Sequence, residues 1–280
     1  KADAVLPDTE WASEYKKYSP TRIKAVKLRS FWSEGIILPF DILPNGKDLK
    51  ELIEGTDVSE LINVTHYQAP IPDDIQAKGP LPYLIGKTDE ERAESEYYLP
   101  INELCDVTLK VDGSSCSYYY HVGDKQFGIL GRTQELYENF ENKYTVNVTR
   151  YDIKNKLINF CEKHNVSLCI RGESYGKGIQ NNNNNPHSKL NNGWAMFSVY
   201  NIDKRRYERK NNKYYFLNIF KELDLPIVDI IEKDVLFTKD MIQKYAIDTD
   251  MINNNKFEGV VVQHGNGSFK ILSKDYDSKK

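Results

Sequence analysis

Lys110 stands out because it is a lysine in an apolar, strand-like stretch. It lies in TLKVDGSSCSYYY (residues 108–120), where apolar residues flank it and Asp112-Gly113 follows. Lysine is disfavoured inside strands, whereas an amine whose pKa is lowered by its surroundings acts as a nucleophile. Taken alone, Lys110 would be interpreted first as a surface lysine on an edge strand.

Further candidates follow in order along the chain, each on or beside a predicted strand. They are Arg132 in GRTQEL, Glu173 in RGESYG, Phe197 in MFSVYNI, Glu258 in EGVVV, and Lys270 and Lys274 in FKILSKDY. Activating a nucleotide at its α-phosphate needs such a set: a nucleophile, cations for the phosphates, carboxylates for a metal ion and an aromatic face for the base. The alternatives are a Glu173–Arg171 ion pair, a core position for Phe197 and a strand-start role for Glu258.

The elements that must position these residues are mainly antiparallel strands. We expect two strands around Asp112-Gly113, others in DKQFGILGR, VSLCIRGESYG and WAMFSVYNID, and a closing pair in FEGVVVQHG and SFKILS. Apolar spacing predicts helices over residues 152–164, 213–223 and 239–246. A stretch rich in Pro, Asp and Gly, residues 44–98, is expected to be a loop region. The pattern indicates an α+β fold.

The composition of the chain limits its possible binding partners and its possible location in the cell. The 280-residue chain has a formal net charge of -3, so nucleic-acid binding would need a local basic cluster. DKRRYERKNNK (residues 203–213) is one candidate, and a solvated surface turn is the equal alternative. Its four cysteines lack metal-ligand spacing, and neither a membrane-spanning run nor a signal peptide is visible. These features favour a soluble intracellular protein, in cytoplasm or nucleus.

Six segments together resemble a known set of motifs. KVDG, GRT, RGESYG, FSVYNID, EGVV and FKILSK look like the nucleotidyltransferase motifs of the covalent nucleotidyltransferase superfamily, which includes DNA ligases, RNA ligases and mRNA capping enzymes. Longer segments, among them RIKAVKLRSFWSEGIILP and GTDVSELINVTHYQAP, resemble ATP-dependent RNA ligases that carry an N-terminal OB domain.

The resemblance covers nearly the whole chain and implies its domain organisation. It implies a partial OB-type β-barrel over residues 1–45 whose opening strands are absent, and a linker or extension over residues 46–98. Residues 99–280 would form an antiparallel-sheet nucleotidyltransferase domain of the ligase and capping type.

The resemblance also implies a role for each matching residue. Lys110 would attack the α-phosphate of ATP and hold AMP, and Glu173 would bind the ribose, directly or through metal-bound water. Phe197 would stack on adenine, and Glu258 would hold Mg²⁺ or Mn²⁺. The remaining implied contacts are Asp112 near the metal, Thr108, Leu109 and Val111 beside the nucleotide, and Arg132, Lys270 and Lys274 on nucleotide or phosphate groups.

Two positions depart from the motifs of many relatives. Leu109 stands where a polar or acidic residue is common, and Lys270 and Lys274 are spaced KxxxK where KxK is common. The first departure bears on how adenine is selected. The second bears on whether Lys274 contacts phosphate.

The resulting expectation is an ATP-dependent RNA ligase that acts through lysyl-AMP. It would join a 5′-phosphate to a 3′-hydroxyl of RNA in a nicked duplex, as a monomer. A DNA ligase and an mRNA guanylyltransferase are the alternatives within the superfamily. A nucleic-acid-binding module with a degenerate pocket is the alternative from another class.

Overall fold

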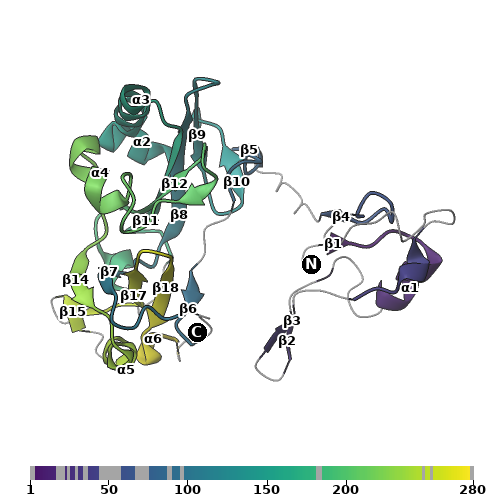
Figure 1. Cartoon of the computed structure of the whole chain (residues 1–280). Helices are drawn as coiled ribbons and strands as arrows, with labels where there is room; N and C mark the ends of the chain where they lie inside the picture. The colour runs from purple at the N-terminus through teal and green to yellow at the C-terminus, as the bar shows by residue number, and fades with distance from the viewer. Residues whose placement is uncertain are drawn as a thin grey trace. The chain divides into compact units, whose positions relative to one another are not determined.

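The computed structural model of the chain divides into two units, residues 1–70 and 71–280 (Figure 1). Each unit is described by itself. The structure describes residues 4–16, 23, 26–28, 31–33, 37–43, 58–66, 76–86, 90–94, 98–180, 185–247, 250–252 and 255–277. In this part of the chain, no helix is long and apolar enough to cross a membrane.

The first unit contains short elements. Strand β1 (Ala4–Val5) pairs antiparallel with β4 (Thr65–His66), and β2 (Val26–Leu28) pairs with β3 (Phe31–Ser33). Helix α1 (Glu10–Lys16) and the 3₁₀ turn η1 (Phe40–Ile42) complete the described elements. The described residues form no closed barrel, so an OB-type barrel over residues 1–45 is not confirmed.

The larger sheet of the second unit has seven strands in the order β13-β12-β11-β8-β9-β10-β5. All its neighbours pair antiparallel. The strands are β5 (Ala77–Pro80), β8 (Ser114–His121), β9 (Gln126–Leu130), β10 (Gln134–Leu136), β11 (Leu168–Tyr175), β12 (Gly193–Asn201) and β13 (Arg206–Tyr207).

The smaller sheet has five strands in the order β14-β7-β17-β18-β6. The pairs are antiparallel except that β18 and β6 run parallel. The strands are β6 (Glu91–Arg92), β7 (Leu104–Leu109), β14 (Ile230–Leu236), β17 (Gly259–Gln263) and β18 (Ser268–Leu272). A separate two-stranded ribbon is formed by β15 (Asp250–Ile252) and β16 (Asn255–Lys256).

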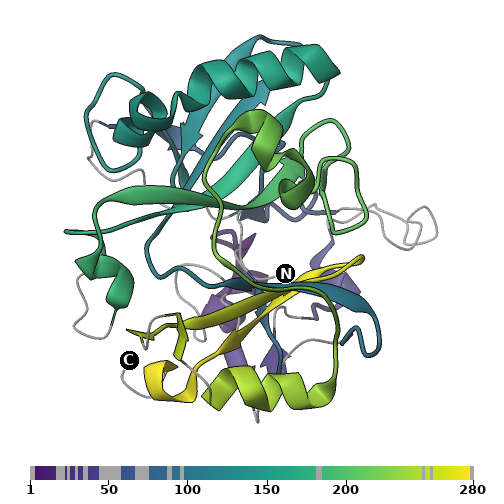
Figure 2. The same cartoon turned by 90° about the vertical axis from the view of Figure 1, so that its left-hand side faces the viewer.

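Helices pack on each sheet, as the two views show (Figures 1 and 2). Helix α3 (Ile153–His164) buries Ile153, Leu157 and Phe160, whose spacing gives one apolar face. The helix ends at Asn165, which has a left-handed φ of 47° suited to a C-cap. The other helices of this unit are α2 (Thr145–Tyr151), α4 (Phe216–Leu223), α5 (Lys239–Ile247) and α6 (Lys274–Asp277).

Each sheet has its own hydrophobic core. One cluster joins the seven-stranded sheet to α3 and α4 and includes Tyr118, Leu157 and Trp194. Another joins the five-stranded sheet to α5 and includes Val107 and Phe269. A smaller cluster of the larger sheet includes Tyr119 and Leu130. The core of the second unit is therefore divided between the two sheets.

The α+β prediction with antiparallel sheets is confirmed, and so are the three predicted helices, with ends shifted by up to three residues. The loop expected over residues 44–98 is wrong where β4, β5 and β6 lie. Strand β4 pairs with β1, and β5 and β6 form outer edges of the two sheets of the second unit. Gly and Pro in β5 and the charged pair of β6 carry no strand propensity.

Candidate active site

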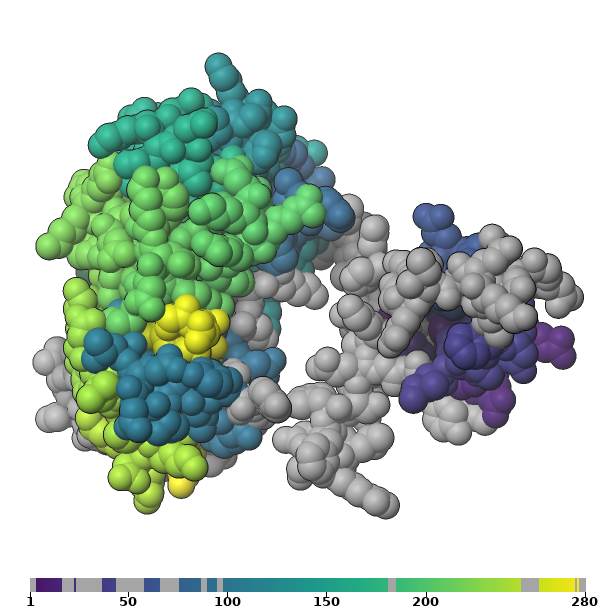
Figure 3. All heavy atoms as spheres, viewed as in Figure 1, coloured from purple at the N-terminus to yellow at the C-terminus, as the bar shows by residue number. Residues whose placement is uncertain are grey.

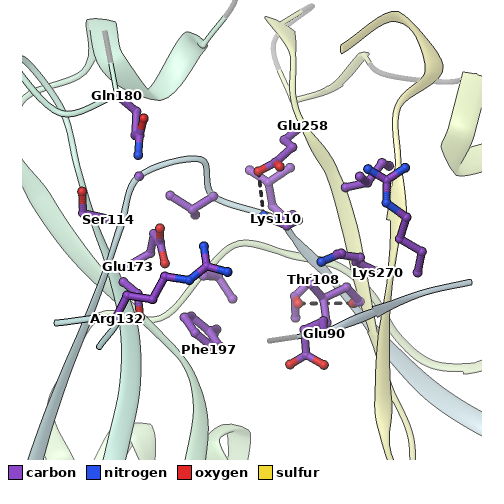
Figure 4. A pocket seen from close by; sticks show the side chains of 18 of the residues that line it. Glu90, Thr108, Lys110, Ser114, Arg132, Glu173, Gln180, Phe197, Glu258 and Lys270 are labelled. Carbon is purple, nitrogen blue, oxygen red and sulfur yellow. Dashed lines mark hydrogen bonds and ion pairs between the residues drawn. The ribbon is translucent and has the colours of Figure 1, made fainter. Parts of the chain in front are cut away.

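A cavity of about 460 Å³ is lined by strands of both sheets of the second unit (Figure 4). Lys110, Glu258 and Lys270 come from the smaller sheet, and Glu173 and Phe197 come from the larger one. The predicted site residues that line the cavity are Thr108, Leu109, Lys110, Val111, Arg132, Glu173, Phe197, Glu258 and Lys270.

Lys110 and Glu258 meet because their strands are antiparallel neighbours. Leu109 at the end of β7 lies opposite Val260 in β17, and the Lys110 N–H donates to the Gly259 carbonyl at 2.9 Å. Lys110 Nζ then lies 2.7 Å from Glu258 Oε2. Lys110 follows β7 directly instead of lying within a strand, so its side chain enters the cavity without disturbing the apolar face of the sheet.

Close backbone packing explains why glycine follows Glu258 and Asp112 in the sequence motifs. Gly259 has a φ of 147°, and a Cβ there would lie 2.1 Å from the Ile271 carbonyl oxygen. A Cβ on Gly113 would lie 2.2 Å from the Ser174 carbonyl oxygen. Glycine is therefore required after Glu258 and after Asp112 because the backbone of a neighbouring strand passes too close for any side chain.

The Lys110 amine is charged in this arrangement. Its burial would lower its pKa, but the ion pair and hydrogen bond with Glu258, with smaller contributions from Glu173 and Asp112, raise the pKa above its usual value. Lys110 must therefore lose a proton before its nitrogen can attack, and Glu258 Oε2 is the acceptor nearest to it.

The Glu173 carboxyl group, in contrast to the Lys110 amine, is held in its neutral form. Burial, reinforced by Glu258 and Asp112 and opposed by Lys110, raises the pKa of Glu173 to about 8. The carboxyl group therefore keeps its proton at neutral pH until a cation enters the cavity.

We expect Glu173→Gln to stabilise the ligand-free protein at high pH. The raised pKa favours the folded state below pH 4.5, and this advantage is lost as pH rises through 8. The amide has no proton to lose, so the variant should gain about 1–2 kcal/mol over the wild type at pH 9, roughly 3–6 °C in Tm, and little at pH 5. Thermal unfolding in EDTA across this range measures the difference.

Glu138→Gln is the matched control, because Glu138 forms an exposed pair with Lys154 on the surface. A Tm gain for Glu173→Gln that does not depend on pH would contradict a buried carboxyl group with a raised pKa.

Phe197 faces the cavity because of a β-bulge. In the pairing of β11 with β12, Arg171 lies opposite Ser198 and Gly172 lies opposite Met196, so Phe197 is the extra residue between them. A bulge turns a side chain away from its regular alternation. Phe197 packs partly on the larger core and also lines the cavity, where Figure 4 shows its ring.

Two predicted residues do not line the cavity. Lys274 is exposed at the start of α6, and Asp112 accepts a hydrogen bond from Tyr276 of the same helix. Asp112 still contributes to the raised pKa values of Lys110 and Glu173. A contact of Lys274 with phosphate and of Asp112 with a metal ion stay predictions.

The cavity also contains residues that sequence reasoning missed. Glu90 and Arg92 line it from the region of β6, and Tyr144 and Gln180 line it from loops and the start of α2. The charged run that holds Glu90 and Arg92 looks like a solvated surface, so no pattern in it predicts a site. They line the cavity because β6 pairs with β18 at the edge of the smaller sheet.

His187 has no metal-ligand spacing to other residues, so nothing in the sequence indicates a role for it. It is 4% exposed, and its Nδ1 has no hydrogen-bond partner in the described part of the chain. Burial lowers the pKa of His187 to about 4, with Glu258 raising it and Lys110 lowering it. A neutral imidazole therefore lies close to the Lys110–Glu258 pair.

The described residues contain no cluster of three His, Cys, Asp or Glu side chains with metal-binding geometry. Mg²⁺, however, needs only one or two carboxylates because it keeps several water ligands. Glu258 and Glu173 supply carboxylate oxygens to the cavity, and burial together with Glu258 and Asp112 disfavours the charged form of Glu173 until a cation binds there. The donor set fits a hard divalent cation.

Comparisons with known proteins agree with this geometry. The model of the RNA ligase family matches residues 105–274. The chain is 26% identical to Naegleria gruberi RNA ligase with PPi, covering 99% of this chain and 84% of that one, with a TM-score of 0.61. A mutant of that ligase with ATP and Mn gives the same identity, coverage and TM-score, and one with AMP and Mn has a TM-score of 0.59 at the same identity and coverage. No curated protein matches.

Proposed function

The chain belongs to the RNA ligase family, and we propose that it is an ATP-dependent RNA ligase that holds AMP covalently on Lys110. The observation that carries the proposal is the Lys110–Glu258 pair, at 2.7 Å, in a cavity that also contains Arg92, Lys270 and Phe197. The structures of the Naegleria ligase with ATP and Mn and with AMP and Mn support the choice of cofactors.

The first step forms a bond between Lys110 Nζ and the α-phosphorus of ATP. The amine gives up its proton, for which Glu258 is the nearest acceptor, and the bond from the α-phosphorus to the bridging oxygen breaks. Pyrophosphate leaves with the electron pair. Covalent catalysis divides the difficult joining of two RNA ends into separate displacements at phosphorus.

The next two steps use the energy of this adenylate. An oxygen of the RNA 5′-phosphate attacks the AMP phosphorus, the bond to Lys110 breaks, and the amine takes up a proton again. The RNA 3′-hydroxyl then attacks the 5′-phosphate, loses its proton and displaces AMP. Each displacement depends on positioning and on cations near the developing charge.

The side chains divide these tasks. Lys270, Arg92 and Arg132 place positive charge around the phosphates, while Phe197 offers a face to adenine. Glu258, Glu173 and Asp112 would hold Mg²⁺ or Mn²⁺, which supplies further positive charge to the phosphates when bound.

Phe197→Ala is expected to weaken ATP binding. Loss of one base-stacking face costs about 1–3 kcal/mol, which corresponds to roughly 5- to 150-fold in affinity. The KM for ATP in self-adenylation should rise accordingly, and Phe197→Tyr should restore most of it. Phe220→Ala, on α4 away from the cavity, is the control. An unchanged KM in Phe197→Ala would place the base elsewhere.

The overall proposal is tested by labelling and chase. The protein is incubated with α-labelled ATP or GTP and Mg²⁺ or Mn²⁺, denatured, and inspected for covalent label. Labelled protein is then chased with 5′-phosphorylated nicks in RNA or DNA. We expect label from ATP and transfer to RNA; label from GTP would indicate a capping enzyme, transfer only to DNA a DNA ligase, and end binding without label a non-catalytic module.

Finer features belong to the same proposal. We infer that the RNA ends are presented in a nicked duplex and that the chain acts as a monomer, since all cavity residues come from one unit. We also infer that residues 1–45 correspond to part of an OB-type domain followed by an extension over residues 46–98. The 99% coverage of this chain in the Naegleria comparison supports that correspondence.

A further inference from the structure

A positively charged turn joins β12 and β13 in the larger sheet. Tyr200 pairs with Tyr207 and Asn201 pairs with Arg206, which leaves residues 202–205 as the turn of a hairpin. We propose that this turn and the adjoining loop form an RNA-binding surface that guides one strand of the substrate to the cavity. We call it the basic hairpin surface; its members are Tyr83, Lys204, Arg205 and Arg206. The proposal rests on the proposed function.

The cations of this surface are available to a ligand. Lys204, Arg205 and Arg206 are exposed, and no ion pair holds any of them in the described part of the chain. Green atoms of the segment that contains the hairpin lie on the face shown in Figure 3. Three neighbouring exposed cations supply the positive charge that binding a phosphate backbone requires.

The two acidic residues of the same segment accept hydrogen bonds from other groups of the protein. Asp203 Oδ2 accepts a hydrogen bond from the Ser167 N–H at 2.7 Å. Glu208 is 3% exposed and accepts one from Asn201 Nδ2 at 2.8 Å. Asp203 is exposed but its carboxylate accepts the Ser167 N–H, and Glu208 is buried. Both carboxylates therefore have partners within the protein, whereas the side chains of Lys204, Arg205 and Arg206 face solvent.

Arg205 adopts a backbone conformation that other residues would adopt more easily. Its φ is 50°, in the left-handed region that favours Gly, Asn and Asp. The turn itself gains nothing from arginine at this position. Lys125 shares this conformation, so the left-handed φ fixes the direction of the Arg205 side chain and the case for its use rests on its neighbours.

Tyr83 adds an aromatic face beside this guanidinium. The Arg205 Cζ lies 6.0 Å from the centroid of the Tyr83 ring. Tyr83 is 91% exposed, which is unusual for a large aromatic side chain. An exposed tyrosine with an arginine above it offers stacking to a base and charge to a phosphate, which is how single-stranded RNA is bound.

The base of the hairpin is connected to the cavity wall. Arg209 Nη1 donates to Ser268 Oγ at 2.6 Å, and Ser268 Oγ donates to Glu90 Oε2 at 2.6 Å. Glu90 lines the cavity. Lys210 is fixed as well, with ion pairs of 2.5 Å to Asp106 and 2.6 Å to Asp234. The inward cations hold the hairpin beside the site, and the outward cations are left for RNA.

The test compares two charge-neutralising triple variants. One is Lys204→Gln/Arg205→Gln/Arg206→Gln. The control is Lys125→Gln/Lys221→Gln/Lys239→Gln, which removes three exposed cations elsewhere in the same unit; Lys125 also sits in a hairpin turn with a φ of 50°. Binding of the self-adenylated proteins to 5′-phosphorylated nicked RNA is measured over a range of salt concentrations.

We expect the hairpin variant to bind RNA about 10- to 100-fold more weakly and its salt slope to fall by about 2–3, since each lost phosphate contact lowers the slope by about one. The control should bind like the wild type. Equal RNA binding by the hairpin variant, or equal losses in both variants, would overturn the proposal. If the surface bound an acidic protein instead of RNA, the hairpin variant would bind RNA like the wild type, and the proposal would be overturned.

Two further variants separate binding from folding. Arg205→Gly relieves the left-handed backbone, so it should raise or preserve Tm while weakening RNA binding. Tyr83→Ala should weaken binding about 5-fold or more, and Tyr83→Phe should retain it. Self-adenylation by the wild type needs no RNA: its failure would refute the proposed function, whereas normal labelling with unaltered RNA binding in the variants would refute only this surface.

Discussion

Lys110→Arg should abolish the transfer of AMP from ATP to the protein. Arginine keeps the positive charge beside Glu258, but its guanidinium is protonated at every accessible pH and offers no lone pair for attack on phosphorus. The loss should exceed about 10³-fold, because removing a nucleophile eliminates the covalent route altogether. Covalent label retained after denaturation measures this step directly.

The control is Lys154→Arg, whose lysine also pairs with a glutamate, Glu138, at 2.7 Å but on the surface. This variant should label like the wild type. A pre-adenylated RNA substrate provides a second control, because sealing of such RNA no longer needs attack by Lys110. Label on Lys110→Arg at wild-type levels would mean that another residue carries AMP.

Glu258→Gln should lower the rate of self-adenylation by about 10²-fold or more and move its pH dependence to lower pH. The lower rate follows from the loss of a carboxylate that accepts the Lys110 proton and would hold the metal ion. The shift follows because Glu258 raises the pKa of Lys110, and the neutral amine that attacks becomes more abundant as pH rises. Single-turnover labelling from pH 6 to 10 measures both effects.

The direction of the shift is the informative result. If Glu258 only bound the metal ion, the variant would be slower at every pH with an unchanged midpoint. A midpoint that moved to higher pH would contradict the ion pair as the source of the raised pKa of Lys110. Glu138→Gln should leave both the rate and the midpoint as in the wild type.

The central residues of the cavity could be predicted from sequence because strand order and motif spacing define them together. Lys110 follows β7, Glu173 lies near the end of β11 and Glu258 directly precedes β17. Antiparallel pairing of β7 with β17 then brings Lys110 and Glu258 into direct contact. The glycines beside Lys110 and Glu258 strengthen the pattern because close backbone approach permits no other residue.

The rest depended on three-dimensional details without a local signal. Phe197 reaches the cavity through one extra residue in β12, which strict alternation does not predict. Arg92 belongs to a two-residue strand that only its partner β18 defines. His187 is placed near Lys110 by a turn far from it in sequence, so its lowered pKa, caused mainly by burial, follows from tertiary structure.

The division of the hydrophobic core between the two sheets determines how a bound nucleotide affects the stability of the protein. The walls of the cavity belong to separate sheets with separate apolar clusters. A nucleotide held on one side by Lys110 and Lys270 and on the other by Glu173 and Phe197 would therefore link the two sheets, and its binding would stabilise both together. ATP, and then the AMP held on Lys110, would connect the two sheets until AMP is transferred to the RNA.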